Sequence, residues 1–182
     1  FDLACSGART ATRSGSPFKP GIDFYDDGAG KVGQARALQD LARVTNVKMV
    51  VLSIGGNDFN FGDIVQTCIT NFLLSPSWWP NYCYDDASVS GNFTAAAVTA
   101  RTTAVKGAIL NVRTAMTNAG YTTSQYRIVV QNYPSPVPGG SGFRYSQSGY
   151  TRQSVGGCGF WNRDADWANA TALATINSAV AN

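Results

Sequence analysis

The sequence predicts an α/β fold in which helices cover both faces of a parallel sheet, a three-layer, flavodoxin-like arrangement. Residues 47–54 and 127–131 are apolar runs rich in β-branched side chains, typical of strands buried on both faces of a parallel sheet. Between these runs, apolar residues recur at helical spacing from Val98 to Met116. A strand, a long helix and a second strand form a βαβ unit, whose crossover we expect to be right-handed.

The other predicted elements follow from the same periodicity. A helix precedes the first strand, and its apolar positions are Val32, Ala35, Leu38, Leu41 and Ala42. Another helix starts near Phe61, and the long helix ends at Gly120, which can supply a left-handed C-cap. A last helix starts near Asp164. Its apolar face is predicted to hold Trp167, Ala170, Leu173, Ile176 and Val180.

Composition indicates a secreted globular domain. The chain has 182 residues, of which 44% are hydrophobic and 14% charged, which suits a single domain over 1–182. The net charge of +3 is scattered without a basic run, so we expect no nucleic-acid surface. No apolar run reaches the ~18 residues that a membrane span requires. All eleven acidic residues are Asp, which excludes a chemistry that needs a Glu base.

The most informative segment is 50–58, where the first strand runs into Gly55, Gly56, Asn57 and Asp58. Ligands bind at the carboxyl ends of parallel strands. The glycines allow a tight turn, after which the Asn57 amide can direct N–H donors into a cleft, as in an oxyanion hole. The alternative is that Asn57 and Asp58 cap the helix that starts near Phe61.

Together with Leu3–Ala8, which reads Leu-Ala-Cys-Ser-Gly-Ala, the Gly-Gly-Asn-Asp segment resembles the SGNH, or GDSL-type, esterase and lipase family. The likeness is closest to its secreted actinobacterial branch. The resemblance implies that the Gly7 backbone N–H and the Asn57 side chain are oxyanion-hole donors. The family's Gly-Asp-Ser and Asp-x-x-His motifs are absent, and the chain contains no His. We therefore expect the central part of a longer enzyme, incomplete at both ends, with additional polypeptide segments carrying the Ser and His.

A substitute catalytic centre within the chain is not expected. With no His, a Ser nucleophile would need a Lys base, but none of the lysines lies in a Ser-x-x-Lys motif. These lysines are Lys19, Lys31, Lys48 and Lys106. Gly139–Gly142 is followed by Phe143, where a nucleophile elbow requires Gly. This chain alone is therefore not expected to hydrolyse an ester.

The cysteines indicate an oxidising compartment. Cys68 and Cys83 flank a short irregular segment, and a disulfide between them would contribute on the order of 3 kcal/mol. For Cys5 and Cys158 the resemblance implies partners outside this sequence. The alternatives are a Cys5–Cys158 bridge or two free buried thiols. Without His or closely paired cysteines, no metal site is expected, and no cofactor is expected either.

Two long irregular stretches, about 75–93 and 132–162, are dense in aromatic residues. They are Trp78, Trp79, Tyr82 and Tyr84 in the first, and Tyr133, Phe143, Tyr145, Tyr150, Phe160 and Trp161 in the second. These side chains either form an acyl- or sugar-binding wall or bury themselves under the loops, the second being favoured. A third loop, around Arg13 to Gly30, is predicted as an insertion, since the interval from Gly7 to Asn57 is long for the resembled family.

Gly28–Gly33 matches the G-x-G-x-x-G dinucleotide pattern. The preceding residues are too acidic for a buried first strand, so we interpret this segment as a loop leading into a helix.

Three functions remain open at this point. The leading one is a secreted serine esterase or lipase acting on a lipid, an acetylated polysaccharide or a small ester. The alternative is a non-catalytic carbohydrate- or protein-binding or structural protein on the same scaffold. A nucleotide-binding oxidoreductase, based on the glycine pattern, is the weakest.

Overall fold

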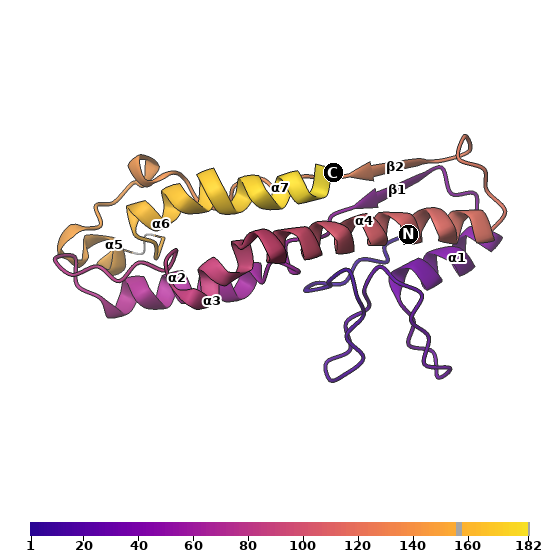
Figure 1. The fold of residues 1–182 in the computed structure, drawn as a ribbon, viewed down its shortest axis with the longest axis horizontal. Helices are drawn as coiled ribbons and strands as arrows, with labels where there is room; N and C mark the ends of the chain where they lie inside the picture. The colour runs from indigo at the N-terminus through magenta and orange to yellow at the C-terminus, as the bar shows by residue number, and fades with distance from the viewer. Residues whose placement is uncertain (156–157, 182) are drawn as a thin grey trace. The chain divides into compact units, whose positions relative to one another are not determined.

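The computed structural model describes residues 1–155 and 158–181, excluding the side chains of Tyr150 and Gln153. The chain divides into two compact units, shown within Figure 1. The first comprises Phe1–Asp58, Thr99–Asn132 and the C-terminal residues from Ala179, and the second comprises Phe59–Val98 and Tyr133–Ser178. Each unit has a hydrophobic core of its own.

The first unit contains the predicted strand, helix and strand. Strands β1 (Met49–Leu52) and β2 (Arg127–Val130) pair in parallel, with Met49 opposite Arg127 and Leu52 opposite Val130 (Figure 1). Helix α1 (Gln34–Val44) precedes β1. Helix α4 (Ala95–Asn118) lies between the strands in sequence, and most of it belongs to this unit. The structure is therefore mixed α/β with a two-stranded parallel sheet, which confirms the predicted class at this level.

Periodicity predicted both helices because each buries one apolar face. Helix α1 buries Ala35, Leu38 and Ala42 at spacings of three and four residues, and α4 buries Val105, Val112 and Met116. Gly120 ends α4 as predicted. Its φ is 92°, and the N–H groups of Gly120 and Tyr121 bond to the carbonyls of Thr117 and Met116 in a Schellman motif.

Within the described residues, one face of the sheet is covered and the other is exposed, whereas the sequence predicts burial of both. Val50 and Leu52 pack with the helices in the core, whereas the alternate residues Met49 and Val51 are more than half exposed, and Val129 of β2 is exposed as well. Successive side chains of a strand point to opposite faces, so a continuous apolar run is buried on both sides only where both faces are covered. In the described part of this unit, α1 and α4 pack on the Val50 face.

The second unit is helical. It contains α2 (Phe61–Leu74), α3 (Ala87–Ser90), the 3-10 helix η1 (Gly91–Phe93) and α6 (Asn162–Trp167). It also contains most of the helical residues that follow α6 toward the C-terminus. The loop predicted over 132–162 holds three short helical turns: η2 (Gly140–Gly142), η3 (Ser148–Tyr150) and α5 (Thr151–Ser154). The core of the unit consists of Ile64, Cys68, Cys83, Val89, Phe160 and Ala165. Helix α2 begins at Phe61, as predicted.

The last helix differs in its buried face from the prediction. Helix α6 continues into the π-helical segment η4 (Ala168–Leu173) and then α7 (Ala174–Ala181). Ile176 and Val180 are buried as expected, but Ala170 is exposed and Ala172 is buried instead. A π turn holds more residues than an α turn, so an extrapolated 3.6-residue period loses register across it.

The glycine pattern at 28–33 is a loop leading into a helix, as interpreted. Asp26 bridges Val32 in antiparallel fashion, and the Asp27 carboxylate accepts hydrogen bonds from the N–H groups of Ala29 and Lys31. Gly33 is the N-cap of α1. Across the described residues, none of the helices has the length and apolar character to cross a bilayer.

Candidate functional site

The candidate site lies at the carboxyl end of β1. The residues Ile54, Gly55 and Gly56 are buried, and the Asp58 N–H donates a 2.9 Å hydrogen bond to the Gly55 carbonyl, so the chain turns sharply. Gly55 has a φ of 112°, and a Cβ there would lie 3.2 Å from Val105 Cγ2. Glycine is required at this position both for the backbone conformation and for close packing. The turn fixes the direction in which Asn57 and Asp58 leave the strand.

Asn57 contacts the N-terminal segment. Its side-chain Nδ2 donates a 2.8 Å hydrogen bond to the carbonyl oxygen of Ala8, 49 residues earlier in the chain. The N-cap of α2 is Asn60, without a side-chain cap bond. The helix-cap interpretation of Asn57 and Asp58 is therefore wrong, and the Asn57 amide lies against the Gly7 segment.

Gly7 forms the bend of that segment. The Ala8 N–H donates a 3.0 Å hydrogen bond to the Cys5 carbonyl, and Gly7 has a φ of 76° at the third position, as a type II turn requires. Lys19 Nζ donates a 2.6 Å hydrogen bond to the Ser6 carbonyl. A Cβ at Gly7 would be 3.7 Å from that ammonium group. The turn therefore places the Ser6 carbonyl oxygen against a positive charge.

Two further hydrogen bonds join the N-terminal segment to the turn after β1. The Asp58 carboxylate accepts hydrogen bonds from Thr10 Oγ1 at 2.6 Å and from the Thr10 backbone N–H at 3.1 Å. Arg101 Nε of α4 donates a 2.7 Å bond to the Asp58 carbonyl oxygen. Burial lowers the pKa of Arg101, an effect that the neighbouring Asp58 carboxylate opposes. Sequence reasoning missed Thr10 and Arg101 because nothing local marks partners that lie 48 and 43 residues from Asp58.

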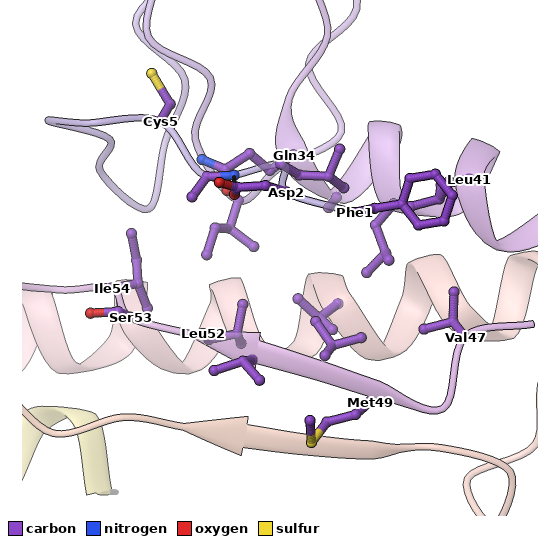
Figure 2. Close-up of a pocket in the computed structure, with 18 of the residues that line it drawn as sticks. Phe1, Asp2, Cys5, Gln34, Leu41, Val47, Met49, Leu52, Ser53 and Ile54 are labelled. Atoms are coloured by element: carbon purple, nitrogen blue, oxygen red, sulfur yellow. Dashed lines mark hydrogen bonds between the residues drawn. The ribbon is translucent and has the colours of Figure 1, made fainter. Parts of the chain in front are cut away.

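An apolar groove of about 580 Å³ runs along β1 toward this site. Figure 2 shows the groove between β1 and the N-terminal residues, with Leu52 and Ile54 extending into it and β2 on the other side of β1. Cys5 and Ala8 line the groove as well, so it reaches the segment that Asn57 contacts. Within the described sheet, β1 has β2 as its single strand neighbour, and its other backbone edge borders the groove.

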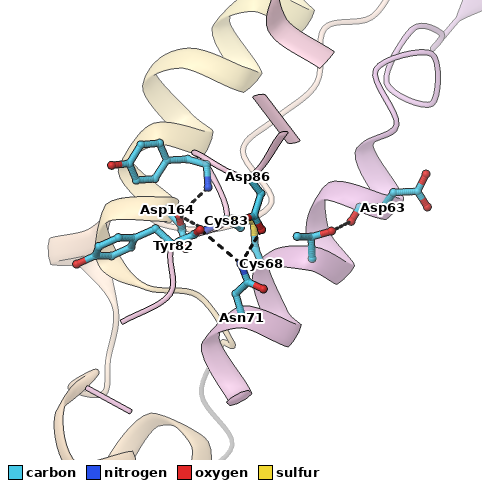
Figure 3. Close-up of a disulfide and its surroundings, with 9 residues drawn as sticks. Asp63, Cys68, Asn71, Tyr82, Cys83, Asp86 and Asp164 are labelled. Atoms are coloured by element: carbon cyan, nitrogen blue, oxygen red, sulfur yellow. Dashed lines mark hydrogen bonds between the residues drawn. A yellow bond between two sulfur atoms is a disulfide. The ribbon is translucent and has the colours of Figure 1, made fainter. Parts of the chain in front are cut away.

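The predicted disulfide between Cys68 and Cys83 is confirmed, with a Cα–Cα distance of 4.8 Å. Figure 3 shows the polar contacts around it. Asn71 Nδ2 donates to Asp86 Oδ2 at 2.8 Å, and Asp164 Oδ1 accepts the N–H groups of Cys83 and Tyr84 at 3.0 and 3.2 Å. Asp164 is fully buried, and this burial raises its pKa to about 6.

Cys5 and Cys158 form no disulfide among the described residues. Cys158 is exposed and Cys5 half-buried, so the alternative of two buried thiols is also wrong. Both thiols remain accessible for partners outside this sequence.

The aromatic residues of the long loops differ in exposure. Half-buried among them are Tyr82, Tyr84, Tyr133, Phe143 and Tyr145, and the Tyr150 side chain lies outside the described residues. Phe160 and Trp161 are buried, as the favoured interpretation predicts. Trp78 and Trp79 are instead among the most exposed large side chains of the described chain. No cluster of three or more Cys and Asp side chains that could hold a metal ion occurs in the described residues.

The bond from Asn57 to Ala8 thus joins the turn after β1 to the N-terminal turn that contains Gly7. Comparisons with protein-family models, curated proteins and solved structures found no match to this chain. Its function is therefore inferred from the residues and geometry of the site.

Proposed function

We propose that this chain supplies the oxyanion hole of a secreted serine ester hydrolase of SGNH, or GDSL, type. The observation that supports this proposal is the hydrogen bond from the Asn57 side chain to the Ala8 carbonyl, in the turn that contains Gly7. One Nδ2 hydrogen of Asn57 makes that bond and fixes the amide. The second hydrogen, together with the Gly7 N–H, is assigned to the oxyanion. Preorganised donors of this kind stabilise charge that develops in the transition state.

The nucleophile and base come from polypeptide other than residues 1–182, because this chain has no His. We place such a segment in the apolar groove along β1. A strand laid along the open edge of β1 would bury its apolar side chains against Leu52 and Ile54. Carboxyl ends of parallel strands meet at one edge of a sheet, so a Ser directly after that strand would emerge beside Ala8 and Asn57.

The added strand also belongs to the finer fold that we propose, a three-layer, flavodoxin-like sandwich. The exposed Met49 and Val51 face is the surface that a further helical layer would cover.

In the reaction, the Ser oxygen attacks the ester carbonyl while His accepts its proton. The carbonyl oxygen becomes the oxyanion held by Gly7 and Asn57. The alcohol then leaves with the proton from His, and water hydrolyses the acyl-enzyme.

The substrate is an ester of a lipid, an acetylated polysaccharide or a small alcohol. A disulfide at Cys68 and Cys83 supports an extracellular location, since such bonds persist in oxidising compartments.

The direct test is the intact mass of the native protein before and after reduction, combined with labelling by a serine-directed phosphonate. We expect mass beyond the 19.3 kDa chain, and phosphonate on a Ser outside residues 1–182. A bare 19.3 kDa chain without esterase activity would contradict the proposal and favour the non-catalytic binding protein.

A further inference from the structure

Four large apolar side chains are exposed in the second unit, at the end of α2 and in the loop that follows. We name residues 73–80 the tryptophan loop. Leu74, Trp78 and Trp79 are 81%, 76% and 78% exposed, and Leu73 is more than half exposed. Scattered apolar residues are normal on protein surfaces, but two Trp and two Leu within one short segment form a patch that indicates an interaction.

No charged residue lies between Asp63 and Asp85 in the sequence. The tryptophan loop is therefore flanked on both sides by uncharged chain. Arg163 lies near this stretch, with its guanidinium over the rings of Tyr82 and Tyr84 at 5.3 and 4.9 Å. Residues 73–80 themselves offer no counter-charge, so recognition by them comes from apolar and aromatic contact.

The loop is held in shape at its base. Ser75 is buried, and its hydroxyl donates to the Asn71 carbonyl and accepts the Asn81 N–H at 3.0 Å. The Trp79 N–H closes a turn on the Pro76 carbonyl at 3.0 Å. The Cys68–Cys83 disulfide spans the loop's two sides. The indole rings are thus presented by a braced segment, and little ordering is needed when they bind.

We propose that the tryptophan loop docks on a lipid–water interface with uncharged or zwitterionic headgroups. Trp favours the interfacial region of a bilayer because its ring is apolar while its N–H reaches polar headgroups. Leu73 and Leu74 add aliphatic surface that suits acyl chains. A sugar site combines stacking rings with converging polar side chains. Here the Asn71 amide donates to the Tyr82 carbonyl and the Asp86 carboxylate, and the Ser75 hydroxyl donates to the Asn71 carbonyl, so both groups are bonded at the base of the loop. The docking does not depend on the proposed hydrolysis.

The test is partitioning of the 182-residue chain onto phosphatidylcholine vesicles, measured by flotation and by quenching of Trp fluorescence with brominated phosphatidylcholine. The variant Trp78→Ser/Trp79→Ser removes the rings at exposed positions without opening the core. Val44→Ser is the matched control, since Val44 is 81% exposed at the end of α1. We expect the double variant to partition at least about tenfold more weakly and the control to match the parent.

Partitioning should also be unchanged by 0.5 M salt, because screening acts on charges and the loop has none. Equal partitioning of the parent and the double variant would overturn the proposal. Binding restricted to anionic vesicles and lost in salt would overturn it too. A loop-dependent dimer in solution, or loop-dependent binding of soluble oligosaccharides without vesicle binding, would assign the loop to a different partner and likewise refute it.

Discussion

The side-chain amide of Asn57 donates a 2.8 Å hydrogen bond to the Ala8 carbonyl, the residue next to Gly7. This bond joins the turn after β1 to the N-terminal turn. It holds the Asn57 side-chain amide in one orientation against a fixed acceptor.

The backbone at Gly7 gives the first prediction. Gly7→Ala places a Cβ at a φ of 76°, a left-handed conformation that costs an L-residue about 1–2 kcal/mol. We expect the free energy of unfolding, measured in urea, to fall by about that amount. Gly107→Ala is the matched control. Gly107 lies within α4 of the same unit with open space around it, so alanine should raise helix stability by up to about 1 kcal/mol. Equal changes in the free energy of unfolding for the two substitutions would contradict a left-handed backbone conformation at Gly7.

The contact between Thr10 and Asp58 gives the second. Thr10→Val keeps the side-chain shape but removes the hydroxyl that donates to the Asp58 carboxylate. Hydrogen bonds to charged groups contribute about 1.5–3 kcal/mol, so we expect a loss of unfolding free energy in that range. Thr103→Val, which removes an exposed hydroxyl bonded to its own helix, should change stability by less than about 0.5 kcal/mol. Similar losses in both variants would show that Thr10 does not hold the two segments together.

Burial of Asp164 predicts a pH dependence. Its folded pKa of about 6 lies above the ordinary value of 3.8, so between pH 4 and 6 the folded state binds more protons than the unfolded state. This contribution to stability is fully present below about pH 4 and is lost as the pH rises through 6. The loss amounts to about 3 kcal/mol, since each pKa unit corresponds to about 1.4 kcal/mol.

Asp164→Asn tests this dependence, because an amide keeps an acceptor for the Cys83 and Tyr84 N–H groups but does not titrate. Urea unfolding of the parent and the variant at pH 4, 5, 6 and 7 should show a shallower slope for the variant. Parallel pH profiles would assign the titration to other groups.

Sequence patterns identified the elements that depend on local periodicity and caps. Helix α1, the long α4 with its Gly120 cap and the start of α2 follow from the spacing of apolar residues and from single glycines. The Cys68–Cys83 disulfide followed from the short, irregular segment between the cysteines. Each of these features is determined by residues close together in the chain.

What the sequence missed depends on distant partners or on an irregular backbone. The run at Met49–Leu52 is equally apolar on both faces, so its alternation of buried and exposed residues reflects which face the helices cover. The π segment at Ala168–Leu173 moved Ala170 to the surface. The acceptor of Asn57 at Ala8 and the contact of Asp58 with Thr10 could not be predicted, because these partners lie far away along the chain.

The most direct test of the central proposal is the kcat of p-nitrophenyl ester hydrolysis by the native protein, with Asn57→Ala compared with Asn111→Ala. Asn111 is the matched control because its Nδ2 also donates to a backbone carbonyl, that of Ile22, at 2.9 Å. Loss of one oxyanion donor lowers kcat by about 10²–10³, so we predict that fall for Asn57→Ala with little change in KM, and near-parent kcat for Asn111→Ala. An unchanged kcat in Asn57→Ala, or an equal fall in both variants, would contradict the assignment of Asn57 to the oxyanion hole.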